Sequence, residues 1–171
     1  MKTWIIAAIA ATALFPAQRT SAENIYKGEK TVGLTGGYHS YNSSGVAGIE
    51  FTYRFSKHFR LSPGVMYVFR HRDTDALQLN INADVPFPTS SRCDIYPFAG
   101  LCYSSWNRHG ALRVEDENHD VSNRTSRLGL NVGGGVNFAA SGNLRLGVRA
   151  GYSFIKEYGG AMALATIAYR F

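Results

Sequence analysis

The feature that most constrains this fold is a period of two in hydrophobicity that recurs along most of the chain. It is clearest over residues 76–87, where every odd-numbered position is apolar and most even-numbered positions carry Gln, Asn or Asp. Successive side chains of a β-strand point to opposite faces, so this pattern predicts a strand with one apolar and one polar face. The same pattern predicts eight strands, at residues 31–39, 46–55, 59–70, 76–87, 95–106, 127–138, 144–154 and 160–171.

The lengths and spacing of these strands favour a membrane-spanning barrel. Most have about 9 to 12 residues, the length that crosses a bilayer at the usual tilt. The connections after the second, fourth and sixth strands are compact, whereas the longest connection, the polar residues 107–126, follows the fifth. Short turns on one side and longer loops on the other are typical of outer-membrane barrels. We therefore predict an all-β fold, an eight-stranded antiparallel transmembrane up-and-down β-barrel, with residues 107–126 as a structureless external loop.

Alternation alone does not distinguish a membrane barrel from a soluble eight-stranded carrier, whose apolar face points inward. Three features favour the membrane barrel. Glycine is frequent on the polar face, which suits a narrow lumen, and the lysines after residue 22 lie at strand ends or in connections. The aromatic residues of the apolar face collect near both strand ends, as in the two aromatic girdles of membrane barrels. The apolar face is thus expected to meet lipid; in the fifth strand, which has aromatics at both parities, we place Leu101 and Tyr103 on that face.

The last strand, GAMALATIAYRF, ends on an aromatic residue. With the patches GLNVGGGVNF and LRLGVRAGYSF, it resembles the small eight-stranded outer-membrane β-barrel proteins of Gram-negative bacteria, of the outer-membrane protein X type. This resemblance implies that Tyr169 and Phe171 belong to an assembly signal read by the barrel-insertion machinery. It specifies a fold and carries no activity with it.

The first 22 residues have the organisation of a secretory signal peptide. Lys2 supplies the positive region, residues 4–15 form an apolar run, and Thr20, Ser21 and Ala22 are small residues before a cleavage site. We expect a signal peptide at 1–22 and an outer-membrane barrel domain at 23–171, exported to the bacterial outer membrane. The expected partners are periplasmic chaperones and the insertion machinery, then outer-membrane lipid and lipopolysaccharide around a monomer. The net charge of +6 is modest and no nucleic-acid motif accompanies it.

Neither cofactor nor metal is expected. Cys93 and Cys102 are nine residues apart on one predicted strand, about 30 Å when extended, whereas a disulfide needs Cα atoms within about 7 Å. Both are therefore predicted to be free thiols unless Pro97 folds the segment back, and neither has metal-ligand spacing. His39 and Ser40 are neighbours and could suggest a catalytic pair, but adjacent strand residues point to opposite faces.

Charged residues at inward positions form a candidate lumen network. It could conduct ions or protons, or it could be a structural plug, because eight strands enclose only enough room for side chains. We favour the plug, since buried charges must be paired to be tolerated. The network, which has two acids and four bases, comprises Glu50, Arg54, Arg60, Asp84, Arg145 and Arg149, with Arg170 also at an inward position.

The long loop holds the candidate contact residues. An acidic run flanked by arginines could bind a divalent cation, but it lacks the Gly and oxygen spacing of a calcium loop. It could also contact lipopolysaccharide phosphates or an external protein ligand. The candidates are Arg108, Arg113, Glu115, Asp116, Glu117, Asp120 and Arg124.

These observations predict a non-enzymatic outer-membrane barrel that presents external loops for adhesion or envelope contact, or that supports envelope integrity. One alternative is a narrow pore for small solutes or ions. The other is a lipid A-modifying outer-membrane enzyme, for which the sequence offers no motif.

Overall fold

A computed structural model describes residues 28–111 and 120–171, with backbone only for 110, 111 and 120–123. The expected signal peptide, Arg113, Glu115, Asp116 and Glu117 lie outside the described residues. The strands are β1 (Lys30–His39), β2 (Ser44–Ser56), β3 (Phe59–His71), β4 (Thr74–Asp84), β5 (Phe87–Pro88), β6 (Cys93–Ala111), β7 (Asp120–Ala139), β8 (Leu144–Ile155) and β9 (Gly160–Arg170). No helix within the described ranges is long and apolar enough to span a membrane.

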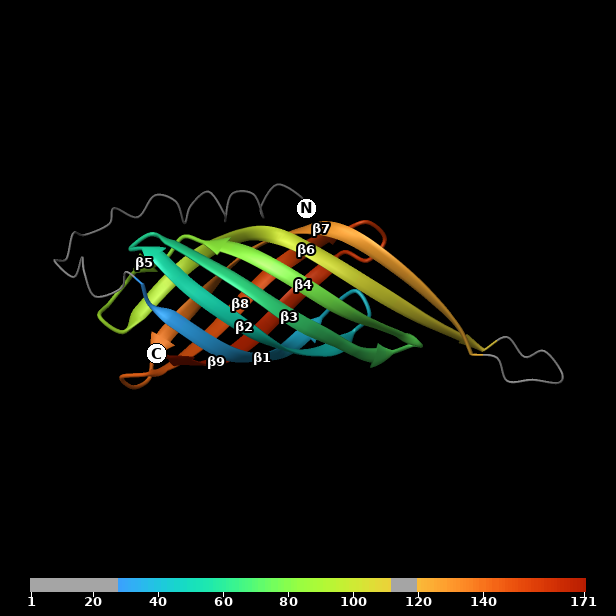
Figure 1. The fold of residues 1–171 in the computed structure, drawn as a ribbon, viewed down its shortest axis with the longest axis horizontal. Coiled ribbons are helices and arrows are strands. Elements are labelled where there is room, and N and C mark those ends of the chain that lie inside the picture. The colour runs from blue at the N-terminus through green and yellow to red at the C-terminus, as the bar shows by residue number, and fades with distance from the viewer. Residues whose placement is uncertain (1–27, 112–119) are drawn as a thin grey trace, which may run out of the picture.

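The strands close into an antiparallel barrel (Figure 1). Each long strand pairs with its neighbour in sequence, β4 pairs with β6 past the two-residue β5, and β1 pairs with β9. Closure leaves no unpaired sheet edge along the barrel wall, which is the requirement for a β-structure in hydrocarbon. The predicted eight-stranded antiparallel barrel is confirmed.

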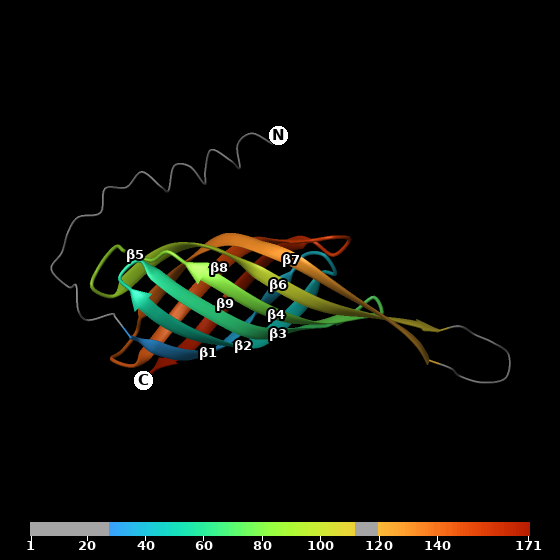
Figure 2. The same cartoon turned by 45° about the horizontal axis from the view of Figure 1, so that its top comes forward.

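The barrel has two distinct ends, which we name by what lies there. Thr31 pairs with Arg170, so the first and last strands begin and finish at the same end, the terminus end. Turns at residues 57–58, 89–92 and 140–143 lie at this end as well. The opposite end, the hairpin end, carries the turns at 40–43, 72–73 and 156–159 and the much longer β6–β7 hairpin, which projects well beyond the rim (Figures 1 and 2).

Five predicted strands agree with β1, β2, β3, β8 and β9 to within two residues at each end. The predicted strand at 76–87 is too long: β4 stops at Asp84, before Pro86, which has no N–H to donate to a ladder, and the chain resumes as β5. The predicted loop at 107–126 is wrong over most of its length. Asn107 pairs with Arg124 and Ala111 with Asp120, so β6 and β7 continue as a two-stranded ribbon.

The outer and inner faces differ as the alternation predicts. Leu101 and Tyr103 are 61% and 43% exposed, which confirms their placement on the lipid side of β6. Inward positions of β6 carry the buried rings of Tyr96 and Phe98. Glycines make room for them: a Cβ at Gly133 would lie 2.7 Å from Phe98 Cζ and 2.3 Å from the Ala150 carbonyl oxygen. The Gly-rich face is therefore needed because these rings fill the lumen.

Candidate functional site: the filled lumen and the projecting hairpin

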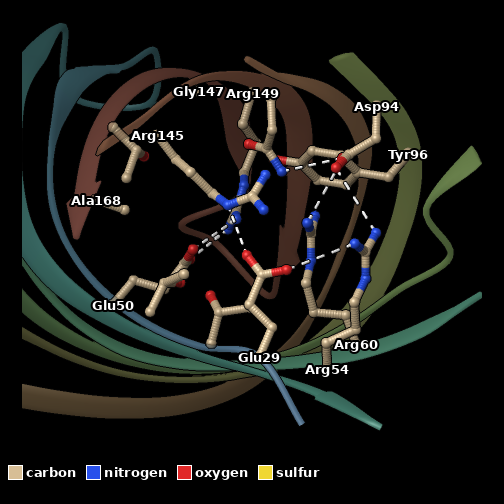
Figure 3. Close-up of a pocket in the computed structure, with 14 residues that line it drawn as sticks. Glu29, Glu50, Arg54, Arg60, Asp94, Tyr96, Arg145, Gly147, Arg149 and Ala168 are labelled. Carbon is tan, nitrogen blue, oxygen red and sulfur yellow. Dashed lines mark hydrogen bonds and ion pairs between the residues drawn. The ribbon is translucent and has the colours of Figure 1, made fainter. Parts of the chain in front are cut away.

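A layer of ion pairs fills the lumen toward the terminus end (Figure 3). Arg149 of β8 reaches across to Glu50 of β2, with Nη1 to Oε2 at 2.6 Å and Nη2 to Oε1 at 2.8 Å. Arg60 Nε donates to Asp84 Oδ2 at 2.8 Å, and Ser62 Oγ donates to the same oxygen at 2.8 Å. Bidentate and charge-assisted hydrogen bonds of this kind are the strong ones.

Two acids missing from the predicted network complete it. Glu29, just before β1, lies 2.6 Å from Arg145 Nε and 3.8 Å from Arg54 Nη1 through its two carboxylate oxygens. Asp94 of β6 lies 3.7 Å from Arg54 Nη2 and 3.6 Å from Arg60 Nη1. The six predicted residues do converge, but the predicted excess of bases is wrong, because the layer holds as many carboxylates as guanidinium groups.

Aromatic rings pack against these guanidinium groups and complete the filling. Arg60 Cζ lies 4.3 Å from the centre of the Tyr96 ring, and Arg149 Cζ lies 5.2 Å from the centre of the Phe98 ring. A cavity of about 40 Å³ remains among these side chains. The layer therefore leaves little free volume at this level.

Next to the ion-pair layer, toward the hairpin end, lies a layer of amide and hydroxyl side chains. Asn131 Nδ2 donates to Asn80 Oδ1 at 2.8 Å, and Ser153 Oγ donates to Asn131 Oδ1 at 2.8 Å. All three side chains are buried. Hydrogen bonds among buried polar groups replace those that the groups would make with water.

A third layer, apolar and aromatic, closes the lumen at the hairpin end. Trp106, which is 1% exposed, stacks on Tyr158 with ring centres 4.8 Å apart and planes 12° apart. Tyr41 meets both rings edge-on, at 5.1 Å from Trp106 and 5.3 Å from Tyr158. The buried cluster around them comprises Val46, Val68, Ala76, Cys102, Ile155, Met162 and Leu164.

The remaining candidate groups for chemistry are separated or inert in their surroundings. His39 is 1% exposed and faces the lumen, whereas Ser40 is exposed and its Oγ accepts a hydrogen bond from the Ala161 N–H at 2.8 Å. They do not form a catalytic pair. Cys93 and Cys102 are free, as predicted. Within residues 28–111 and 120–171, no three His, Cys, Asp or Glu side chains are grouped so that they could hold a metal ion.

The β6–β7 hairpin contains the described contact candidates. Arg108 and Arg124 are exposed, and Arg124 Nε donates to Ser105 Oγ at 2.6 Å. Asp120 lies in the backbone of β7. Pairing of β7 with β8 begins only at Gly129, opposite Ile155, so among the residues that the structure describes, 120–128 pair with β6 alone. The edge of the ribbon formed by residues 120–128 of β7 is the second feature of the site, after the filled lumen.

The base of the hairpin is tied to the barrel on the side of β4. The His109 N–H donates to the Asp73 carbonyl at 2.8 Å, and His109 Nε2 lies 2.6 Å from Asp75 Oδ1. Tyr67 Oη donates to Asp75 Oδ2 at 3.2 Å. These contacts fix the ribbon where it leaves the wall.

The end of the chain lies on the outer face of the terminus end. Tyr169 is 56% exposed and Phe171 is 63% exposed, and the Phe171 N–H donates to the Lys30 carbonyl at 3.1 Å. Asn143 Nδ2 donates to Tyr169 Oη at 3.0 Å. Their role as an assembly signal stays a prediction.

Residues 7–171 match the outer membrane protein β-barrel domain family. The chain belongs to this family. The search of curated proteins finds no match. Among solved structures, the chain is similar to the N-terminal β-barrel domain of Pseudomonas aeruginosa OprF, with 17% identity, 85% of this chain and 98% of that chain covered, and a TM-score of 0.65.

Two further barrels show the same fold. Neisserial surface protein A (NspA) is 16% identical over 84% of this chain and 95% of its own, with a TM-score of 0.63. The attachment invasion locus protein Ail of Yersinia pestis, in complex with the heparin analogue sucrose octasulfate, is 14% identical over 85% of this chain and 99% of its own, with a TM-score of 0.60. At these identities the likeness concerns the fold alone. Family and fold together support a location in the outer membrane.

Proposed function

We propose that this protein is a non-enzymatic, non-conducting barrel that displays the β6–β7 hairpin at the cell surface, where the free edge of β7 binds an external protein by strand addition. The observation that carries the proposal is the pairing pattern of residues 120–128, which have β6 on one side and no strand of the described ranges 28–111 and 120–171 on the other. In this orientation the terminus end faces the periplasm.

The free edge is long enough for specific binding. Nine residues of extended strand span about 30 Å, and an edge strand presents a row of unpaired N–H and C=O groups toward its open side. An added strand gains main-chain hydrogen bonds along such an edge, while neighbouring side chains supply specificity. Arg124 and Arg127 lie along this stretch and would favour a partner strand with acidic residues.

The filled lumen favours display over transport. Ion pairs, amides and aromatic rings occupy successive levels of the barrel, so a solute would have to displace at least one of them. The opposed directions of His39 and Ser40 likewise give a lipid A-modifying enzyme no catalytic pair at this position. A surface role is also in keeping with the names of two similar barrels, a surface protein and an attachment protein.

A sulfated polysaccharide is a second ligand class. The Ail structure contains a heparin analogue, and here Arg108 and Arg124 are exposed on the hairpin. Binding of a polyanion through exposed arginines weakens as salt rises, because charges are screened over about 8 to 10 Å near physiological ionic strength. Strand addition depends on main-chain hydrogen bonds and should be much less sensitive to salt.

The test is adhesion of a non-adherent Gram-negative host that expresses the barrel. Residues 107–124 are replaced by Asn-Gly, which joins the paired Trp106 and Thr125 through a two-residue turn. We expect this variant to insert normally and to lose adhesion to epithelial cells. A matched control changes the turn at 89–92 at the opposite end to alanines and should leave adhesion intact. Adhesion that survives removal of the hairpin, with normal surface levels, would refute the proposal.

A further inference from the structure

The outer wall of the barrel has a hollow on its lipid side, along β3. Its floor is formed by Pro63 and Val65, and its sides by longer side chains of the neighbouring strands. The pairing register sets Ile49 and Leu79 on either side of Val65. Phe51 and Ile81 flank the hollow beside Pro63.

The hollow has a direction. From Pro63 to Tyr67 it follows β3 toward the hairpin end, a distance of about 13 Å at the rise of a β-strand. Pro63 and Val65 of the middle strand lie between longer side chains of both neighbouring strands, so the hollow runs along β3. In a protein of an outer-membrane barrel family this face lies against lipid, so an extended acyl chain is the occupant whose shape and polarity fit it.

Polar groups mark the hairpin end of the hollow. Tyr67 borders it, and its hydroxyl donates to Asp75, which in turn contacts His109. Arg70 follows Tyr67 by three residues on β3, toward the hairpin end. Its side chain is 55% exposed and its Nη2 lies 2.7 Å from Asp73 Oδ1. An exposed guanidinium retains donors for a phosphate, and Tyr67 has the amphipathic ring favoured at a membrane interface.

We propose that this hollow is a binding groove for one acyl chain of a phosphorylated glycolipid of the lipid A class, with the phosphate held by Arg70 above Tyr67. The proposal rests on the orientation of the proposed function, which sets the hairpin end in the outer leaflet. The groove then selects a lipid that has both an acyl chain in register with β3 and a phosphate at the level of Arg70.

The experiment is native mass spectrometry of the full barrel released from detergent micelles that contain equal amounts of Kdo2-lipid A and phosphatidylglycerol. We expect one retained Kdo2-lipid A. Val65→Trp fills the floor of the groove; because each buried methylene changes a binding constant about fourfold, displacing two should lower retention more than tenfold. Arg70→Gln should also lower retention and should reduce the preference over phosphatidylglycerol.

Matched controls lie elsewhere on the barrel. Leu101→Trp adds the same ring on the lipid face of β6, and Arg127→Gln removes a half-buried, ion-paired cation on β7; both should retain lipid as the unchanged protein does. Equal retention by Val65→Trp, equal loss in Leu101→Trp, or equal retention of phosphatidylglycerol would overturn the groove. A dimer that Val65→Trp dissociates would overturn it in favour of an interface between copies. Val65→Trp leaves the hairpin intact, so its adhesion should be unchanged. Adhesion that survives removal of the hairpin refutes display, whereas unchanged lipid retention in Val65→Trp refutes the groove.

Discussion

The ion-pair layer makes a quantitative prediction for Glu50→Gln. The substitution keeps the size of the side chain and removes its charge; the amide oxygen still accepts one hydrogen bond from Arg149, but the bidentate ion pair is lost. The side chains of Arg149 and Glu50 are only 8% and 16% exposed, and the adjoining cavity of about 40 Å³ has room for little water to replace the carboxylate. Removing one partner of a buried pair costs about 3 to 5 kcal/mol, and we expect a loss of unfolding free energy in this range.

The assay is reversible urea unfolding of the barrel refolded in lipid vesicles, followed by tryptophan fluorescence. Residues 23–171 contain a single tryptophan, Trp106. Its ring is stacked on Tyr158 in the closing layer of the lumen, so its emission reports the barrel interior. The double variant Glu50→Gln with Arg149→Met removes both charges and should be more stable than Glu50→Gln alone, since no unpaired guanidinium remains.

The control is Glu157→Gln. Glu157 pairs with Arg127 at 3.4 Å, but their side chains are 56% and 37% exposed. Exposed pairs contribute about 0 to 1 kcal/mol, so this variant should unfold almost as the unchanged protein does. If Glu50→Gln cost no more than Glu157→Gln, or if the double variant were no more stable than the single one, the idea of a structural ion-pair plug would be refuted.

Three further predictions test other parts of the molecule. Gly133→Val should reduce the yield of folded barrel on a heat-modifiability gel, because its side chain meets Phe98 and the backbone of β8; normal folding would contradict the close packing of the lumen. In planar bilayers, the purified barrel should show no steady single-channel current, and a stable conductance would contradict the filled lumen. Deleting Phe171 should lower the amount inserted in the outer membrane far more than Arg170→Ala, and equal insertion would remove the assembly role of the last residue.

Hydrophobic alternation predicted the wall of the barrel because lipid imposes it. Within the membrane every outward residue must be apolar, so the pattern of residues such as Leu77 and Leu79 follows the strand. The ribbon beyond the rim has no such constraint. Asn107 and Arg124 form a cross-strand pair, but both are polar, so hydrophobicity gave no sign that pairing continues.

The composition of the lumen layer was only partly predictable for a different reason. An odd or even position along a strand identifies a charged residue as inward-facing only after the strand's bounds and its inward face are known. Asp94 precedes the predicted fifth strand, whose two faces both carry aromatics, and Glu29 precedes the first predicted strand altogether. The charge excess of the predicted network was itself a signal, since buried guanidinium groups need counter-charges and only nearby acids can supply them.

The ion pair between Glu29 and Arg145 bears on how the sheet closes into a barrel. Neighbouring strands elsewhere in the wall follow one another in the chain, but the seam between β1 and β9 joins segments from opposite ends of the sequence. Glu29 lies before β1 and Arg145 lies on β8, so their ion pair bridges this seam over the inner face of β9. The pair therefore forms only when β1 and β9 are together, and it stabilises the closed barrel. Weakening this ion pair should raise the rate at which β1 separates from β9. The formation of hairpins between strands that follow one another in the chain should be unchanged.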